Sequence, residues 1–206
     1  SKLFRTKSND FIFASGLHAL YSPQLRDCYN IKVYLDINEK LRRFFKIRRD
    51  VGERGHQLSD VLESLDARDA DSKKFILPQK EHADLIFSIR PLWSNVLEDA
   101  NIEVSDQLEL VVKTKNESNY FTLNRILVGL CGLHVDTSIS TDGSEVTMTI
   151  EGEVSRYDIA MVAGIICPNM LELMDINPEW DDGVLGIMQL ITLSLINEAL
   201  IKSSGK

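Results

Sequence analysis

The sequence lacks a run of 18 or more apolar residues, because polar side chains interrupt its longest apolar stretches earlier. No membrane-spanning helix is therefore expected. Cysteine is also scarce, and its wide spacing gives neither a zinc pattern nor a disulfide framework, which favours a reducing cytosol. The three cysteines are Cys28, Cys131 and Cys167. The first residues contain no secretory hydrophobic segment, so we expect a cytoplasmic protein.

Basic residues are outnumbered by acidic ones, 23 against 31, and the formal net charge is −8. This balance argues against a nucleic-acid partner, since duplex binding requires a basic surface. Four catalytic or nucleotide-binding motifs are also missing: G-x-x-x-x-G-K-[ST], G-x-G-x-x-G, H-E-x-x-H and G-x-S-x-G. The four histidines have no metal-ligand spacing, so we assign none of them to a metal: His18, His56, His82 and His134.

Charge is distributed unevenly along the chain. Residues 1–92 carry 17 basic and 13 acidic side chains, whereas residues 93–206 carry 6 basic and 18 acidic ones. Residues 32–56 alone hold eight basic and four acidic residues. Arginine's planar fork suits phosphate and carboxylate, so this excess indicates an anion site. The alternative interpretation is a solvated helix face, which is what most charge runs are.

The first part reads as strands that alternate with helices, which predicts an α/β fold with a mainly parallel sheet. Asn38 stands where a helix N-cap belongs, and the helix after it should run to about Val51. On that helix Arg42, Lys46 and Arg49 are spaced i, i+4 and i+7 and share one face. Buried strands are expected at residues 11–14, 31–37 and 83–89, and a second helix at residues 59–69.

The change in charge and pattern near Pro91 predicts two domains, residues 1–92 and residues 93–206. The second is expected to be a smaller α+β region, with a strand at residues 107–113 and a hairpin around Asp142-Gly143. Residues 123–133 fit a helix or a buried strand equally. Two long helices should follow, one from Ser155 with a kink at Pro168 and one over residues 184–201. The last is apolar almost all round, so it is a core element or an oligomer contact, buried on at least three sides.

Three stretches of the first part together resemble the phosphoribulokinase and uridine kinase family. They are Ser15-Gly-Leu-His-Ala-Leu-Tyr21, Lys46-Ile-Arg-Arg-Asp-Val-Gly-Glu-Arg-Gly-His56, and Phe75-Ile-Leu-Pro-Gln-Lys80 with Ala83-Asp84. The combination is closest to the long phosphoribulokinases of eukaryotes and cyanobacteria. Val146-Thr-Met-Thr-Ile-Glu-Gly152 and the final helix also resemble the C-terminal region of that form. The resemblance implies the C-terminal part of a P-loop kinase fold.

The resemblance also implies a reaction, in which the γ-phosphoryl group of ATP passes to a sugar-phosphate or nucleoside hydroxyl with Mg²⁺ as cofactor. Lys46 and Arg49 match positions that neutralise transition-state charge, and Asp50 matches a motif residue that is either catalytic or orients the arginines. Arg54 matches a phosphate-binding position on a lid between Gly52 and Gly55. Substrate-binding roles for the remaining motif residues follow by the same resemblance, with strand termination as the alternative for the last two: His18, Gln79 and Lys80.

Two departures from the family pattern qualify this interpretation. The phosphate loop is missing, so we expect the chain alone to be inactive. Ser15 stands where the family has an acidic residue that supports Mg²⁺, and a hydroxyl supplies no charge. The first hypothesis is therefore one part of an ATP-dependent small-molecule kinase. The alternatives are a degenerate domain that binds a phosphorylated metabolite or serves assembly, and an interaction domain with solvated arginines. The expected partners are nucleotide, acceptor and a second copy held through the C-terminal region, with no membrane.

Overall fold

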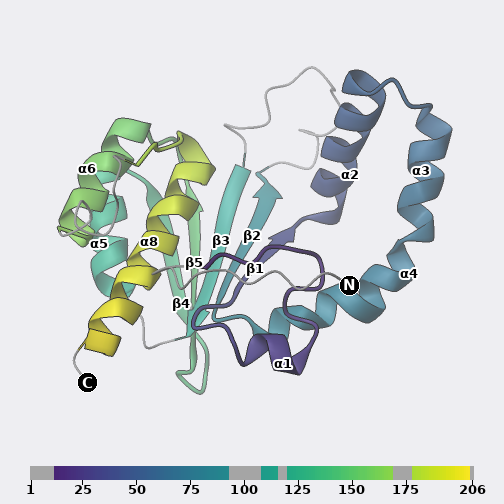
Figure 1. The fold of residues 1–206 in the computed structure, drawn as a ribbon. Coiled ribbons are helices and arrows are strands. Elements are labelled where there is room, and N and C mark those ends of the chain that lie inside the picture. Colours follow the sequence, from purple (N-terminus) through teal and green to yellow (C-terminus); the bar gives the residue numbers. More distant parts are fainter. Residues whose placement is uncertain (1–11, 93–107, 116–119, 169–177, 205–206) are drawn as a thin grey trace.

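The computed structural model describes residues 12–92, 108–115, 120–168 and 178–204, which form one five-stranded sheet with helices around it (Figure 1). The sheet order is β1-β2-β3-β5-β4. The strands are β1 (Val33–Ile37), β2 (Leu85–Pro91), β3 (Leu108–Lys115), β4 (His134–Ile139) and β5 (Glu145–Glu151). An α/β fold is confirmed. Among the described strands only the β1–β2 pair is parallel, whereas β2–β3, β3–β5 and β4–β5 are antiparallel. A tight turn joins β4 to β5, and such a turn connects antiparallel strands.

A helical arm follows β1. Asn38 caps it as predicted, since its side chain accepts hydrogen bonds from the backbone N–H groups of Lys40 and Leu41. The helix continues into a π-helical turn and then reverses, so that two helices stand beside the sheet (Figure 1). A short helix, α1 (Pro23–Arg26), precedes β1. The elements that follow β1 are α2 (Glu39–Ile47), η1 (Arg48–Glu53), α3 (Leu58–Ala67), α4 (Asp69–Asp71), η2 (Ser72–Ile76) and η3 (Leu77–His82).

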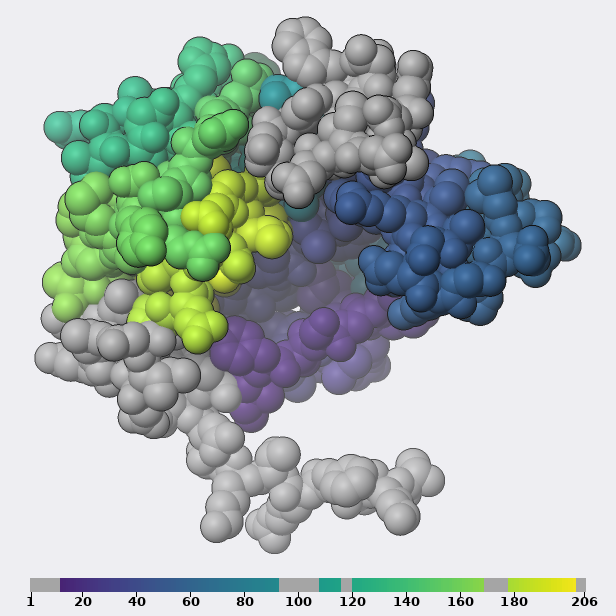
Figure 2. All heavy atoms as spheres, turned by 90° about the horizontal axis from the view of Figure 1, so that it is seen from above, coloured from purple at the N-terminus to yellow at the C-terminus, as the bar shows by residue number. Residues whose placement is uncertain are grey.

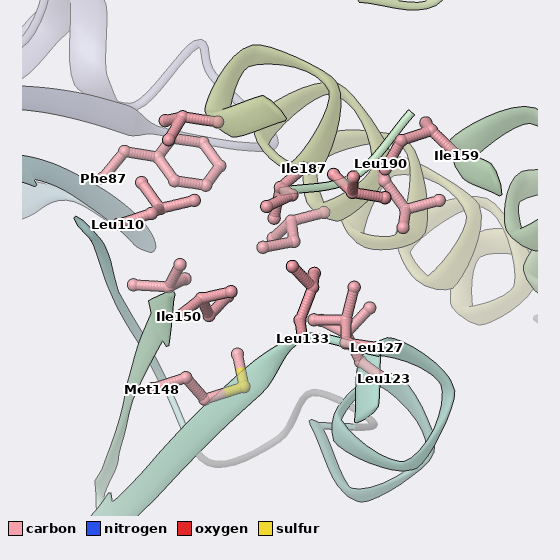
Figure 3. Packing of buried hydrophobic residues seen from close by; sticks show 14 of the residues in the cluster. Phe87, Leu110, Leu123, Leu127, Leu133, Met148, Ile150, Ile159, Ile187 and Leu190 are labelled. Atoms are coloured by element: carbon pink, nitrogen blue, oxygen red, sulfur yellow. The ribbon is translucent and has the colours of Figure 1, made fainter. Parts of the chain in front are cut away.

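The hydrophobic core lies between one face of the sheet and three helices. These are α5 (Tyr120–Cys131), α6 (Arg156–Ile166) and α8 (Gly183–Ser204). Alternate residues of the strands point into this layer because side chains alternate along a strand. Figure 3 shows them against α5 and α8. Its fully buried members include Phe87, Leu110, Leu127, Met148, Ile150, Ile159, Ile187 and Leu190.

Helix α8 is less buried than its sequence predicts. Its buried side chains face the sheet and α6, while Leu185 and Ile201 are 56% and 64% exposed. The prediction of burial on at least three sides is wrong, because the described sheet and α6 cover one side of the helix and leave these residues exposed. Over residues 183–202 the mean hydropathy is 1.8 and 28% of the segment is buried. By length and composition alone this helix could cross a membrane, whereas the sequence analysis expected no membrane-spanning helix. One face of the helix nevertheless packs in the core.

Two further sequence predictions need correction or completion. Residues 12–14 form no strand, and Ile12 and Phe13 are 75% and 82% exposed, since no described strand pairs with them. Residues 123–133, left open between helix and strand, fall mainly in α5. The helix from Ser155 ends at Ile166, before Pro168, and its predicted continuation at residues 169–177 lies outside the described residues.

The sheet is continuous across the predicted domain boundary at residue 92. β2, from the first part, pairs with β3, from the second, over seven residues from Leu85↔Thr114 to Pro91↔Leu108. Leu41 and Phe87 of the first part lie in the same buried cluster as Ile150 and Leu190 of the second. The two parts thus share one core.

The contribution of α8 to this core can be measured with a matched pair of leucines. Leu190 is completely buried, whereas Leu185 on the same helix is 56% exposed. We expect Leu190→Ala to lower the free energy of unfolding by about 2–5 kcal/mol, because a cavity adds to the lost burial. Leu185→Ala should change it by less than about 0.5 kcal/mol. Urea unfolding of both variants tests this, and equal losses would contradict the packing described here.

The β4–β5 turn contains a carboxylate held by three hydrogen bonds. Asp142 Oδ1 accepts from the Ser140 hydroxyl at 2.7 Å, the Ser144 hydroxyl at 2.8 Å and the Ser144 backbone N–H at 3.1 Å. These bonds, led by that of Ser140, lower the pKa of Asp142 from 3.8 to about 2. Gly143 follows with φ +72°, a conformation that favours glycine. The turn predicted from Asp142-Gly143 is therefore stabilised when the carboxyl group of Asp142 is ionised.

Removal of this charge should have a pH-dependent effect. A carboxylate with a lowered folded-state pKa contributes stability above its unfolded pKa, and that contribution is lost as the pH falls. We expect Asp142→Asn to lower the melting temperature above about pH 4, with the difference from the native chain disappearing towards pH 2. Thermal unfolding of both proteins across this range tests it. A difference that grows on acidification would show that the sign is wrong.

Candidate functional site

A basic groove lies where β1 passes into the helical arm. It has a volume of about 590 Å³ and is lined by Ile37, Arg42, Phe45, Lys46, Arg48, Arg49 and Glu53. The helical spacing that predicted a shared face for Arg42, Lys46 and Arg49 is confirmed, since all three line the groove. Figure 2 shows the molecule hollowed between the blue arm, the yellow helix α8 and the purple N-terminal segment. Four cations beside apolar side chains make this groove suitable for an organic anion.

One carboxylate joins two of the predicted site arginines. Asp50 Oδ1 accepts from Arg49 Nε at 2.8 Å and from Arg54 Nη1 at 3.1 Å. Asp50 is only 7% exposed, whereas the side chains of Arg49 and Arg54 remain 49% and 56% exposed. The hydrogen bond from Arg49 lowers the pKa of Asp50 below its ordinary value. Asp50 thus holds both guanidinium groups together while their other N–H groups stay accessible to a ligand.

The backbone explains how Arg54 reaches Asp50. Residues 48–53 form a π-helical turn, which adds a residue to the helical repeat and is frequent at functional sites. Gly55 then adopts φ +70°, and the backbone N–H of His56 donates to the Asp50 carbonyl at 2.9 Å. The chain therefore folds back over the end of the helix, which brings Arg54 close to Arg49 on Asp50.

Polar contacts hold the two arm helices against each other. Lys46 Nζ donates to the Ser64 hydroxyl at 3.2 Å, and Arg43 Nη2 pairs with Asp66 Oδ1 at 2.6 Å. Lys46 thus lies between the groove and α3. Its ammonium group can reach a ligand in the groove by exchanging one weak hydrogen bond for a charge-assisted one.

Gln79 is buried and its side chain is fully engaged. Its amide nitrogen donates to the carbonyls of Leu17 and Phe75, and its amide oxygen accepts from the Leu20 backbone N–H. It therefore ties the segment containing His18 to η3. His18 itself is exposed, and its ring meets the ring of Tyr21 edge-on, with 5.9 Å between the two ring centroids. These contacts assign Gln79 a positioning role for that segment.

Lys80 belongs to a second polar cluster, on the sheet. Its Nζ donates to Asp36 Oδ2 at 2.5 Å, and the Ser88 hydroxyl contacts the same oxygen at 3.3 Å. Burial and the Asp36 charge raise the pKa of the neighbouring Tyr34. Sequence reasoning missed Asp36 and Ser88. The only available signal was the carboxylate of Asp36 within an otherwise apolar strand. Its partners could not be identified, because they depend on the register between neighbouring strands, which the sequence alone does not give.

The Mg²⁺ implied by the family pattern finds no complete ligand set in the residues described. Among them no group of three or more His, Cys, Asp or Glu side chains is placed to hold a metal ion. Ser15, at the position expected to support the metal, is exposed and carries no charge. The described residues therefore do not fit a magnesium site by themselves.

Comparison with known proteins explains the arrangement of the first part. Residues 4–94 match the model of the "Phosphoribulokinase / Uridine kinase family". This segment is therefore similar to members of that family. The chain is 38% identical to a phosphoribulokinase of Synechocystis over 95 residues, which cover 46% of this chain and 28% of the relative. It is 36% identical to a uridine kinase of Lactococcus lactis over 84 residues, covering 40% and 41% of the two chains. The resemblance drawn from the motifs is thus confirmed.

The solved structure of the phosphoribulokinase from Rhodobacter spheroides extends the fold likeness beyond the family segment. It matches with a TM-score of 0.53 over 87% of this chain and 52% of that one, at 18% identity. The second part of the chain therefore shares the phosphoribulokinase fold as well. The chain spans about a quarter of the length of the curated phosphoribulokinases that it matches.

The basic groove predicts measurable anion binding. We expect pyrophosphate to bind the chain at low salt, and Arg49→Ala to weaken binding about 10- to 100-fold, the value of one charge-assisted contact. Arg68→Ala, which removes an exposed arginine at the end of α3, is the matched control and should have no effect. Isothermal titration calorimetry provides the measurement. Equal weakening by both variants would show nonspecific attraction to the basic arm.

Proposed function

We propose that this chain is part of an ATP-dependent small-molecule kinase whose acceptor is a phosphorylated sugar or a nucleoside. The observation that carries the proposal is the pair Arg49 and Arg54 on the buried Asp50, inside a segment of the phosphoribulokinase and uridine kinase family. Phosphoryl transfer requires neutralisation of charge on the transferred group and alignment rather than covalent chemistry. Two fixed guanidinium groups beside Lys46 supply the first requirement.

The individual side chains have separable roles in this proposal. Arg49 and Lys46 stabilise the charge that develops on the transferred phosphoryl group, since they line the groove at its basic wall. Arg54 retains the substrate phosphate, because Asp50 holds its guanidinium group close to that of Arg49, which lines the groove. Asp50 positions both arginines and touches no substrate. Phe45 and Ile37 offer an apolar surface to the rest of the ligand.

The sheet indicates where the rest of a kinase would attach. β1 is the edge of the described sheet, and Val33 and Leu35 on it are 41% and 50% exposed. Parallel strands are ordinarily buried on both faces. We infer that a further strand and helix pack against β1 and bring a phosphate-binding loop to the hollow beside the groove. ATP binding belongs to that combined site.

A second candidate function is a domain that binds a phosphorylated metabolite without turnover. Ser15 favours it, because the position lacks the carboxylate that the family pattern expects. Both functions use the same basic groove, so binding alone does not separate them. Turnover does.

A chimera separates the two functions. Residues 4–94 replace the matching segment of the Synechocystis phosphoribulokinase, and ATP-dependent phosphorylation of ribulose 5-phosphate is measured. We expect activity with Arg68→Ala as control, and a lower kcat with Arg49→Ala, as befits charge stabilisation in the transition state. The 206-residue chain alone should give no turnover.

The outcome with Ser15 decides between the candidates. Activity of the chimera with Ser15 supports the kinase. Activity only after Ser15→Asp supports the metabolite-binding domain. A folded chimera that is inactive with either residue contradicts the kinase proposal.

A further inference from the structure

The three arginines that line the basic groove differ in what already binds them. Arg42 donates two hydrogen bonds of 2.8 Å to the carboxylate of Glu39. Arg49 donates to Asp50, as described above. Arg48 is exposed, and in the part of the chain that the structure describes its guanidinium group has neither an ion pair nor a hydrogen bond. Its positive charge therefore lies in the groove without a compensating carboxylate.

Arg48 and Arg49 leave the arm in different directions, because consecutive residues are about 100° apart around a helix axis. Arg49 shares its side of the arm with Arg42 and Lys46, and we call these three residues the first row. Arg48 neighbours Phe45 instead, since residues three apart lie next to each other on a helix surface. We call these two the second row. Both rows line the groove, and the family resemblance assigns no role to Arg48.

Glu53 also lines the groove, and it lies near the first row. It follows Arg49 by four residues. The pKa of Arg49 is raised by its hydrogen bond to Asp50 and, to a smaller extent, by the charge of Glu53. Among the described residues Glu53 forms no ion pair with Arg48. The charge of Arg48 thus remains available to a ligand.

Phe45 gives the second row an apolar wall. It is 41% exposed, and its ring meets the ring of Phe44 edge to face, with 5.8 Å between the centroids. Phe44 packs in turn against the buried core, so this contact restrains the ring of Phe45. An apolar wall beside a guanidinium group suits a ligand whose carbon skeleton ends in an anionic group.

We propose that Phe45 and Arg48 form a second subsite of the groove, which makes the groove selective for ligands with two anionic groups separated by a carbon skeleton. Arg49, with Arg54 beside it on Asp50, holds the first anionic group. The carbon skeleton lies along Phe45, and Arg48 binds the second anionic group. The groove volume of about 590 Å³ is within the common range for small-molecule sites.

This inference rests on the proposed function and narrows its ligand class. A phosphorylated sugar that has received a further phosphoryl group carries two separated anionic groups, whereas a nucleoside that has received one carries a single group. Arg48 therefore favours the phosphorylated sugar among the two acceptors named above, and it acts as a specificity-determining residue.

Isothermal titration calorimetry of the 206-residue chain at low salt tests the second subsite with three probes. Fructose 6-phosphate and fructose 1,6-bisphosphate differ by one phosphate group. Pyrophosphate carries its charge in a compact form that does not span two subsites. We expect the bisphosphate to bind at least about tenfold more tightly than the monophosphate. Arg48→Gln should weaken the bisphosphate about tenfold and change the affinities of the other two less than about twofold.

Three further variants separate the parts of the proposal. Arg48→Lys keeps the charge and should retain part of the preference for the bisphosphate. Phe45→Ser should weaken both fructose phosphates several-fold and leave pyrophosphate unchanged, because pyrophosphate has no carbon skeleton to contact the ring. Arg68→Gln, on an exposed arginine at the end of α3, is the matched control and should change none of the three. Circular dichroism confirms that each variant is folded.

Three results would overturn the second subsite. They are equal binding of the two fructose phosphates, no binding of any probe, and an equal loss of all three probes in Arg48→Gln. Failure of the proposed function is a different result. An inactive chimera beside an Arg48-dependent preference contradicts the kinase alone, whereas an active chimera without that preference contradicts the second subsite alone.

Discussion

The pairing of β2 with strands on both of its sides holds this structure together. β2 runs parallel to β1 and antiparallel to β3, so one strand joins the basic first part to the acidic second part. Leu85 and Phe87 are each only 2% exposed and lie in the cluster that α8 helps to cover. On the other face Ser88 contacts the Asp36 carboxylate that also binds Lys80. The helical arm and the core helices are therefore positioned by the same strand.

This placement has a consequence for the basic groove. α2 begins at Asn38, whose backbone N–H donates to the carbonyl of Ile89 in β2 at 3.0 Å. The start of the arm is thus fixed to the sheet, while its far end carries Arg49 and Arg54 on Asp50. The π-helical turn and Gly55 therefore lie at the end of the arm that is away from this contact with the sheet.

The sequence predicted the local features whose causes are local. The cap at Asn38, the turn at Asp142-Gly143 and the shared face of Arg42, Lys46 and Arg49 each depend on neighbours within one or two turns of chain. The convergence of Arg49 and Arg54 was also predictable, because glycines flank Arg54. Burial of α8 was overestimated because composition shows how apolar a helix is and not how many elements pack on it. The Asp36–Lys80 contact could not be found, since 44 residues separate its partners.

The uneven charge of the chain is visible in where its charged side chains lie. The basic residues of the first part gather on the arm, where four of them line one groove. In the second part the sheet face away from α5 and α8 carries Glu109, Glu145 and Glu151 together with Lys113 and Lys115, so its charge is mixed. Residues 93–206 as a whole have a net charge of −12, which disfavours anion binding there relative to the basic groove. Within the groove the cations are Arg42, Lys46, Arg48 and Arg49, and Asp50 holds the guanidinium group of Arg49 in place, so the electrostatic attraction for an anion is strongest beside these side chains.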